Sequence, residues 1–273
     1  MKRDNYIKQI ADKSLVWDFV VVGGGATGLG AAVDAASRGF KVVLLEQADF
    51  TKATSSRSTK LVHGGVRYLA QGDVSLVVEA LRERGLMKKN APHLVKDQRF
   101  IIGNYKWWEK PFYTIGLTVY DLLAGKRGLG RSFPMTKKAV ECEIPQINKT
   151  RLRGGVVYHD GQFDDSRMGI NLMQTALEQG AVVANYMKVV GLLKDGSERI
   201  SGVKVVDDLK GGEYTLRSKA VINATGIFVD QVIKMDLPED DDIVRPSQGV
   251  HLVVDKSFLG GDTAIMIPKT SDG

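Results

Sequence analysis

The 273-residue sequence predicts an α/β fold that opens with a strand, a helix and a second strand. Three observations predict it. An apolar run at residues 19–22 ends in the turn Gly23-Gly24-Gly25, a helical pattern follows, and a second apolar run at residues 42–45 ends at Glu46. A strand, a glycine turn, a helix and an acid-terminated strand in this order are typical of Rossmann-like domains that bind dinucleotides.

The rest of the chain continues to alternate between helices and strands. The polar residues 1–16 suit a short helix ahead of the first strand, and apolar spacing after the N-cap residue Asp73 predicts a helix over 73–89. Further patterns predict strands at 98–102 and 156–159 and helices at 115–123 and 164–179.

An antiparallel meander is expected as an insertion before a strand at residues 220–223. Its strands are the short apolar runs 182–184, 189–193, 200–206 and 214–217, with turn signals at Asp195-Gly196 and Lys210-Gly211-Gly212. Two last apolar runs, 249–254 and 264–267, predict strands of a second sheet.

The residues of the first glycine turn suit a dinucleotide. Gly23 permits the tight turn, Gly25 lets a pyrophosphate approach the backbone, and Gly28 lets the helix lie close to the strand. Thr27 lies in the first helical turn, whose N–H groups and positive dipole end face the phosphates. Glu46 lies where a carboxylate accepts hydrogen bonds from the adenosine ribose.

A second turn of small residues favours FAD over NAD. The apolar run 221–222 leads through Asn223 into Ala224-Thr225-Gly226. In flavoproteins with two dinucleotide-binding domains, such a turn returns to the cofactor beside the first glycine loop. The alternative is an ordinary turn between a strand and a helix.

A longer motif gives a resemblance to a known family. Residues 54–69 read TSSRSTKLVHGGVRYL, a hydroxyl-rich stretch followed by His-Gly-Gly-x-Arg-Tyr. With this segment the chain resembles the FAD-dependent glycerol-3-phosphate dehydrogenases and the related α-glycerophosphate oxidases. The resemblance covers nearly the whole chain from residue 18 and includes APHL (91–94), YDLLAG (120–125), DDSR (164–167) and GVHLVV (249–254).

The resemblance and the side-chain chemistry together suggest a flavin site. Short hydroxyl donors can line the diphosphate and the ribityl chain, and bare glycine backbone can lie against the flat ring system. The backbone near Lys188 and Val189 is implied to meet the adenine. The residues expected at the cofactor in this part of the chain are Thr54, Ser55, Ser56, Ser58, Thr59, Leu61, His63, Gly64, Gly65 and Val189.

Three residues are the candidates for the chemistry. Arg67 offers a planar fork of donors that suits a phosphate dianion, and Tyr68 can close the pocket while donating its hydroxyl. His63 can accept the proton of a C2 hydroxyl as hydride leaves for flavin N5. Packing of His63 against the flavin, with no proton transfer, is the alternative.

The activity implied by the resemblance is oxidation of sn-glycerol 3-phosphate to dihydroxyacetone phosphate, with the electrons passing to a quinone or to oxygen. An amine or amino-acid oxidase of the same superfamily and a flavin-binding fragment without turnover are the alternatives. The implied domains are an N-terminal extension (1–17), an FAD-binding domain with insertions (18–240) and the start of a mixed substrate-domain sheet (241–273). Part of 95–155 is expected to join the substrate domain. The resemblance also implies that more chain follows, so we expect this piece alone to be inactive.

The amino-acid composition limits the kinds of ligand and metal site that we expect in this protein. The net charge of +6 suits an anionic substrate, an anionic cofactor or an anionic membrane surface, and no basic stripe interleaved with aromatic residues suggests nucleic acid. The single cysteine, Cys142, forms no intrachain disulfide, and the four histidines show no metal-ligand spacing. We expect a cytoplasmic protein, with contact to the inner face of a membrane through residues 106–113 and a homodimer both left open.

Overall fold

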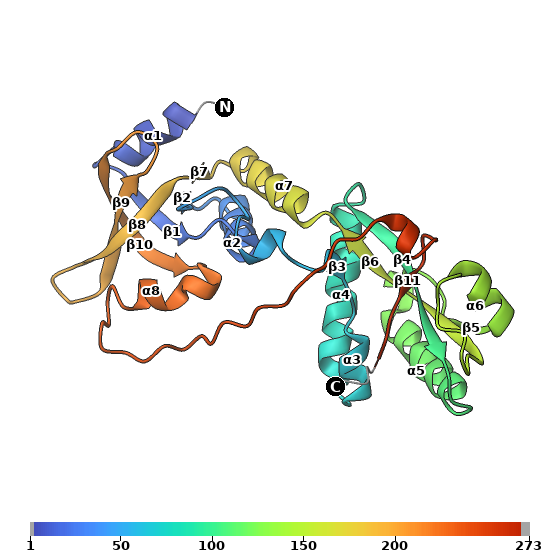
Figure 1. Ribbon diagram of the computed structural model, residues 1–273. Coiled ribbons are helices and arrows are strands. Elements are labelled where there is room, and N and C mark those ends of the chain that lie inside the picture. Colours follow the sequence, from blue (N-terminus) through green and yellow to red (C-terminus); the bar gives the residue numbers. More distant parts are fainter. Residues whose placement is uncertain (1–2, 269–273) are drawn as a thin grey trace. The chain divides into compact units, whose positions relative to one another are not determined.

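The computed structural model describes residues 3–268, which form two compact units (Figure 1). The first unit comprises Met1–Ser58 and Asp165–Gly249, and the second comprises Thr59–Asp164 and Val250–Gly273. The second unit is therefore built largely from a segment inserted into the first. The domain limits expected from the sequence, 18–240 and 241–273, stay a prediction.

A six-stranded sheet forms the centre of the first unit, with strand order β7-β2-β1-β10-β9-β8. Strands β7, β2, β1 and β10 are parallel to one another, whereas β10, β9 and β8 form an antiparallel meander. The strands are β1 (Val16–Val22), β2 (Val42–Leu45), β7 (Val182–Ala184), β8 (Met187–Lys194), β9 (Ile200–Asp207) and β10 (Glu213–Asn223).

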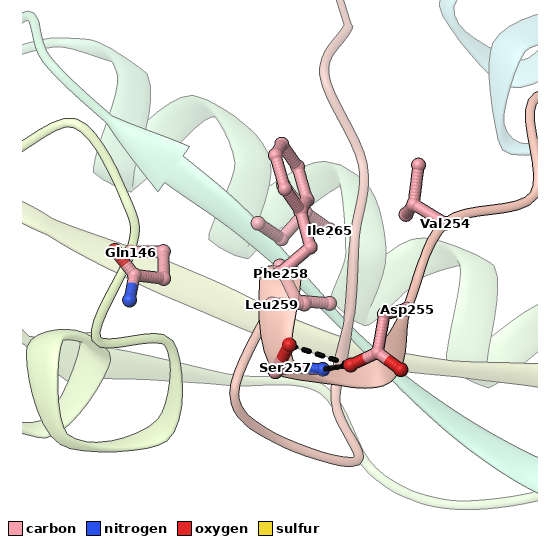
Figure 2. A pocket seen from close by; sticks show the side chains of 7 residues that line it. All are labelled: Gln146, Val254, Asp255, Ser257, Phe258, Leu259 and Ile265. Atoms are coloured by element: carbon pink, nitrogen blue, oxygen red, sulfur yellow. Dashed lines mark hydrogen bonds between the residues drawn. The ribbon is translucent and has the colours of Figure 1, made fainter.

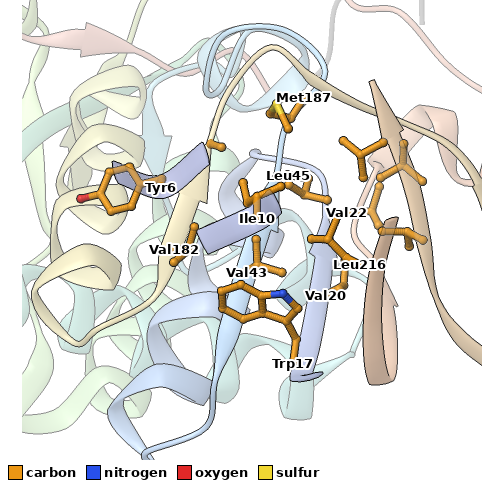
Figure 3. Packing of buried hydrophobic residues seen from close by; sticks show 14 of the residues in the cluster. Tyr6, Ile10, Trp17, Val20, Val22, Val43, Leu45, Val182, Met187 and Leu216 are labelled. Atoms are coloured by element: carbon orange, nitrogen blue, oxygen red, sulfur yellow. The ribbon is translucent and has the colours of Figure 1, made fainter. Parts of the chain in front are cut away.

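Alternate residues of the central strands enter two different cores. Val43 and Leu45 of β2 belong to a cluster with Ile10 and Trp17 (Figure 3), and this cluster also includes Val20 and Val22 of β1. The intervening residues Val21, Val42 and Leu44 pack with Leu29 and Ala176. Strand β2 is therefore buried on both faces, which explains its uninterrupted apolar sequence.

Helices cover both faces of this sheet. The helix α2 (Ala26–Ser37) joins β1 to β2 and packs with α7 (Asp165–Glu178), while α1 (Arg3–Ala11) contributes Tyr6 and Ile10 to the opposite core. The remaining helical elements of this unit are the turn η1 (Thr54–Ser56), the turn η3 (Gly226–Phe228) and α8 (Val229–Ile233).

The second unit contains a five-stranded sheet in which β11, β4, β6 and β3 are neighbours in that order and β5 also pairs with β6. Its strands are β3 (Leu61–Val62), β4 (Val95–Asn104), β5 (Phe133–Thr136), β6 (Gly154–Phe163) and β11 (Ala264–Ile265). Its helices are α3 (Val66–Ala70), α4 (Val74–Asn90), α5 (Glu109–Ala124), η2 (Gly125–Arg127), α6 (Lys137–Glu143) and η4 (Lys256–Phe258). Val77 and Leu81 of α4 pack against Tyr120 and Ala124 of α5 in a small core.

Most expected elements are confirmed, including the Asp73 cap, whose carboxylate accepts from the Leu76 N–H at 3.1 Å. Three expectations are wrong. Residues 182–184 form the strand β7 but are not part of the antiparallel meander, because β7 pairs in parallel with β2. Residues 214–217 and 220–223 form the single strand β10, because its first half pairs with β9 and its second half continues without a break along β1. Residues 249–254 are not a strand, because no strand among residues 3–268 pairs with them, and Val253 is 97% exposed.

Among residues 3–268, no helix combines the length and the apolar character needed to cross a membrane.

Candidate functional site

The glycine loop of the first unit lies at the carboxyl end of β1, beside the end of β10. Gly23 has φ +112° and donates its N–H to the Leu45 carbonyl at 2.8 Å, while the Ala224 N–H donates to the Val22 carbonyl at 2.8 Å. A Cβ at Gly28 would collide with the Gly23 carbonyl. The structure therefore brings the Ala224-Thr225-Gly226 turn next to the first glycine loop, as the sequence predicts.

The start of helix α2 lies open at this loop. Gly25 is the N-cap and carries no capping side chain, and the next N–H, of Ala26, donates to Ser55 Oγ at 2.9 Å. The other N–H groups of the first turn have no partner within the helix. This bare helix start fits a diphosphate, because a Cβ at Gly25 would stand in the same space, 3.0 Å from Ser55 Oγ.

Glu46 follows β2 and faces the same loop. Its two carboxylate oxygens accept from the N–H groups of Gly24 at 2.6 Å and Ala48 at 2.7 Å. Each oxygen keeps a further lone pair, so the carboxylate can still accept from the hydroxyls of a ribose. The Glu46 carbonyl accepts from the Met187 N–H at 2.8 Å, which brings Val189, two residues further along β8, to this side of the sheet.

Asn223 positions the second turn and was not predicted as a site residue. Its Oδ1 accepts from the Thr225 hydroxyl at 2.7 Å, and its Nδ2 donates to the Val229 carbonyl at 3.0 Å. The side chain therefore ties the turn to the start of α8. An asparagine at a strand end before small residues is a recognised turn signal that could have identified it.

The hydroxyl-rich segment is divided between the two units, at Ser58 and Thr59. Thr54, Ser55 and Ser56 form the short helix η1 of the first unit. The Ser58 hydroxyl donates to Asp165 at 2.7 Å, a carboxylate that is 4% exposed at the start of α7. Ser58 therefore fixes the segment to the sheet domain, and Ser55 lies at the start of α2.

In the second unit, His63, Gly64 and Gly65 form a tight turn between β3 and α3. Gly65 adopts the left-handed conformation with φ +74° and donates its N–H to His63 Nδ1 at 3.2 Å. The Gly64 N–H donates to Asp160 Oδ1 at 3.1 Å. Because Nδ1 is an acceptor here, the neutral His63 ring carries its proton on Nε2.

The remaining predicted residues of this unit flank that turn. Arg67 and Tyr68 are exposed on the first turn of α3, and Leu61 is half-buried on β3, where it pairs with Gln162. Burial raises the pKa of Tyr158 on β6, and the charge of the exposed Arg67 opposes this rise. An arginine so placed is available to a phosphate.

The structure thus gives two groups of candidate residues. The first unit holds the glycine loop, Glu46, η1, Val189 and the Ala224-Thr225-Gly226 turn, and the second holds Thr59, Leu61 and the turn from His63 to Tyr68. A separate hollow of the second unit contains none of them (Figure 2). Its lining is mainly apolar and consists of Gln146, Val254, Asp255, Ser257, Phe258, Leu259 and Ile265.

The chain is similar to glycerol-3-phosphate dehydrogenases. It is 45% identical to the mitochondrial enzyme of Rattus norvegicus over 272 residues and 40% identical to that of Schizosaccharomyces pombe over 286 residues. These matches cover 94% and 99% of the chain but only 37% and 44% of the two relatives. The chain therefore spans about two fifths of the length of the curated relatives it matches.

A solved structure agrees with the sequence comparisons. The glycerol-3-phosphate dehydrogenase from Bacillus halodurans, complexed with FAD, is 31% identical and superposes with a TM-score of 0.66, covering 86% of this chain and 39% of that one. The sequence profile of the family described as FAD dependent oxidoreductase matches residues 18–272. The glycine loop, the Ala224-Thr225-Gly226 turn and this match lead to one conclusion: the chain belongs to the FAD-dependent oxidoreductase family.

Proposed function

We propose that the whole protein oxidises sn-glycerol 3-phosphate to dihydroxyacetone phosphate with FAD as the hydride acceptor and a quinone as the next electron acceptor. The observation that carries the proposal is the turn at residues 63–65. Two buried glycines leave bare backbone at the start of α3, and the exposed side chains of His63, Arg67 and Tyr68 surround it. The names of the relatives support the same reaction.

The first unit supplies the groups that would hold FAD. The open start of α2 receives the diphosphate, with Ser55 beside it, and Glu46 accepts from the adenosine ribose. The backbone at Val189 would meet the adenine. Bound FAD supplies the electron-accepting ring of the reaction. We assign Gly64 and Gly65 to the flavin ring, as the resemblance of residues 54–69 to the family implies.

The substrate end is assigned to three side chains. Arg67 binds the phosphate with its planar fork of donors, and the Tyr68 hydroxyl, on a side chain 43% exposed, donates to the same group. His63 takes the proton of the C2 hydroxyl. Nδ1 accepts from the Gly65 N–H and Nε2 carries the proton of the neutral ring, so the bond to Gly65 must break before the ring takes up the substrate proton.

The helix α5 favours quinone over oxygen as the electron acceptor. Large apolar side chains recur at helical spacing along it, at Trp108, Phe112, Ile115, Val119 and Leu122. The exposed fraction of each side chain lies between 41% at Val119 and 74% at Leu122. Lys106 lies over the Trp108 ring at 5.6 Å, and Lys110, Lys126 and Arg127 follow along the helix and its end. Apolar residues bordered by cations suit an anionic lipid surface, where quinones dissolve.

The membrane contact also bears on the compartment. The rat and fission-yeast relatives are mitochondrial enzymes by name. We propose that this protein binds a membrane peripherally, from the side that faces the reducing interior. α-Glycerophosphate oxidase activity, with oxygen as acceptor, is the second candidate and requires no such contact.

The test is reduction of bound FAD by substrate without oxygen. The full-length protein, loaded with FAD, is mixed anaerobically with sn-glycerol 3-phosphate, and we expect the absorption band near about 450 nm to bleach. Glycerol and an L-amino acid serve as controls that should leave the band unchanged. Bleaching by the amino acid but not by glycerol 3-phosphate would overturn the proposal in favour of an amino-acid oxidase.

A further inference from the structure

A buried ionic cluster lies directly beneath the His63-Gly64-Gly65 turn. Asp160 Oδ1 accepts from Arg84 Nη1 at 2.5 Å, from the Tyr120 hydroxyl at 3.0 Å and from the Gly64 N–H at 3.1 Å. Asp160 is 3% exposed, and Arg84 and Tyr120 are each 1% exposed. The four groups come from β6, α4, α5 and the turn, so residues distant in the sequence meet at one carboxylate oxygen.

Burial of the cluster carries a considerable desolvation cost, and the buried Arg84 Nε has no hydrogen-bond partner among the described residues. Burial raises the pKa of Asp160, and the charge and hydrogen bond of Arg84 oppose that rise. Burial likewise raises the pKa of Tyr120, which keeps its hydroxyl protonated as a donor. Arg84 also donates to the His159 carbonyl at 3.2 Å. Apolar side chains commonly replace such a buried pair without loss of stability, so stability alone does not account for it.

The turn is seated tightly on this cluster. A Cβ at Gly64 would overlap Leu81 and the Tyr120 hydroxyl, so only a bare backbone reaches Asp160. On one side of Gly64 is the exposed ring of His63, and on the other is the left-handed Gly65, whose N–H holds His63 Nδ1. The bond to the Gly64 N–H therefore fixes the His63–Gly64 peptide plane, which adjoins the Gly64–Gly65 peptide whose N–H holds the His63 ring.

We propose that Asp160 is a positioning residue that, with Arg84 and Tyr120, sets the orientation of the His63-Gly64-Gly65 turn. The consequence for catalysis rests on the proposed function, which assigns this turn to the flavin and its substrate. The positioning itself does not depend on that assignment. Asp160 contacts neither FAD nor substrate and orients the turn through its hydrogen bond from the Gly64 N–H.

Amide hydrogen exchange measures the positioning directly in the full-length protein. In the double variant Arg84→Met/Asp160→Leu, the ion pair is replaced as a whole, so no buried charge is left unpaired. We expect the peptide spanning residues 61–69 to exchange at least about tenfold faster than in the wild type, because the Gly64 N–H has lost its acceptor. The strands β4 and β6 should keep their protection.

Two further variants separate positioning from general destabilisation. Asp160→Asn retains an amide oxygen that can accept from Gly64, so its exchange at 61–69 should lie between those of the wild type and the double variant. Val140→Ala removes apolar contacts from a different buried cluster of the same unit. It should lower the melting temperature while leaving exchange at 61–69 no faster than elsewhere in the unit.

Substrate kinetics give the functional measurement. With FAD occupancy unchanged, the double variant should reduce the maximal rate of anaerobic flavin reduction by about tenfold or more and change the substrate KM little, because a misplaced turn affects geometry at the reacting atoms. Asp160→Asn should recover part of that rate. Unchanged exchange at 61–69 in the double variant would overturn the proposal, even if glycerol 3-phosphate reduces the flavin. Altered exchange in a protein that glycerol 3-phosphate does not reduce would contradict the proposed function alone.

Discussion

Gly23 and Ala224, at the ends of adjacent parallel strands, lie so close that a Cβ at Gly23 would stand 2.5 Å from the Ala224 carbonyl oxygen. Gly23 also has φ +112°, a conformation that side chains other than glycine's rarely adopt. Two independent requirements therefore select glycine at this point. Both requirements apply where the first glycine loop lies against the Ala224-Thr225-Gly226 turn, at the place where we expect the diphosphate of FAD.

Gly23→Ala should displace the Ala224-Thr225-Gly226 turn and abolish FAD binding, because the backbone strain of about 1–3 kcal/mol adds to the steric conflict. Gly30→Ala is a matched control in the same helix region, since a Cβ there meets no described atom within 4 Å. The control should stabilise α2 by roughly 0.5–1 kcal/mol. Flavin content after purification and thermal unfolding measure both effects, and a fully flavin-loaded Gly23→Ala protein would refute the close approach.

Arg67→Ala should weaken the use of glycerol 3-phosphate without releasing FAD. Loss of a charge-assisted contact to a phosphate should lower kcat/KM roughly ten- to a hundredfold. Arg67→Lys should recover only part of this loss, because an ammonium group cannot present two parallel donors. Steady-state kinetics of the full-length enzyme measure the effect. Arg199→Ala, which alters an exposed residue outside both groups of candidate residues, is the control. Wild-type kcat/KM in both Arg67 variants would remove Arg67 from the site.

Two replacements at His63 distinguish proton transfer from positioning. In His63→Asn the side-chain oxygen can take over the hydrogen bond from the Gly65 N–H, whereas in His63→Leu that bond is lost. If His63 is the base, both variants should reduce the flavin about 10²–10⁴-fold more slowly. A near-normal rate in His63→Asn with a slow rate in His63→Leu would show that the residue only shapes the turn. Stopped-flow absorbance under anaerobic conditions records these rates.

The exposed apolar residues of α5 should bind lipid. Ile115→Lys combined with Leu122→Lys should weaken co-sedimentation with anionic phosphatidylglycerol vesicles by roughly tenfold or more, because two large apolar side chains no longer enter the interface. Phe40→Lys alters a residue of the first unit that is 44% exposed and serves as the control. Equal binding of the wild type and the double variant would show that a protein surface, not lipid, covers this helix.

The ion pair between Arg3 and Asp207 should make stability depend on acid pH. Although burial acts to raise it, hydrogen bonds from Arg3 and from the Leu209 and Lys210 N–H groups hold the pKa of Asp207 below its ordinary value of 3.8. A lowered pKa in the folded state stabilises the protein above the unfolded value and loses that effect as the pH falls through the folded one. The difference in melting temperature between wild type and Arg3→Met should therefore be largest at neutral pH and shrink below about pH 4. Asp4→Asn, which breaks an exposed pair with Lys210, should change little at either pH.

Local sequence patterns predicted the parts of the fold that depend on neighbouring residues. The glycine turn, the Asp73 cap and the meander turns each rest on the conformational preferences of a few consecutive residues. The prediction of a strand at 249–254 is wrong because a local apolar run cannot by itself supply a partner strand. The Asp160 cluster could not be predicted, because Arg84 lies on a helix whose other charged residues are mostly exposed. The burial of Arg84 follows from the tertiary fold and not from the local sequence pattern.

The continuous strand β10 also constrains how the chain folds during synthesis. Val22 of β1 pairs with Asn223 of β10, so the contact between these two strands can form only after the intervening inserted unit has been translated. Contacts between residues so distant in sequence form late, whereas β4 and β6 and the helices beside them can meet sooner. A nascent chain that stops before β10 would expose the edge of β1 and would lack the Ala224-Thr225-Gly226 turn that we expect at the cofactor.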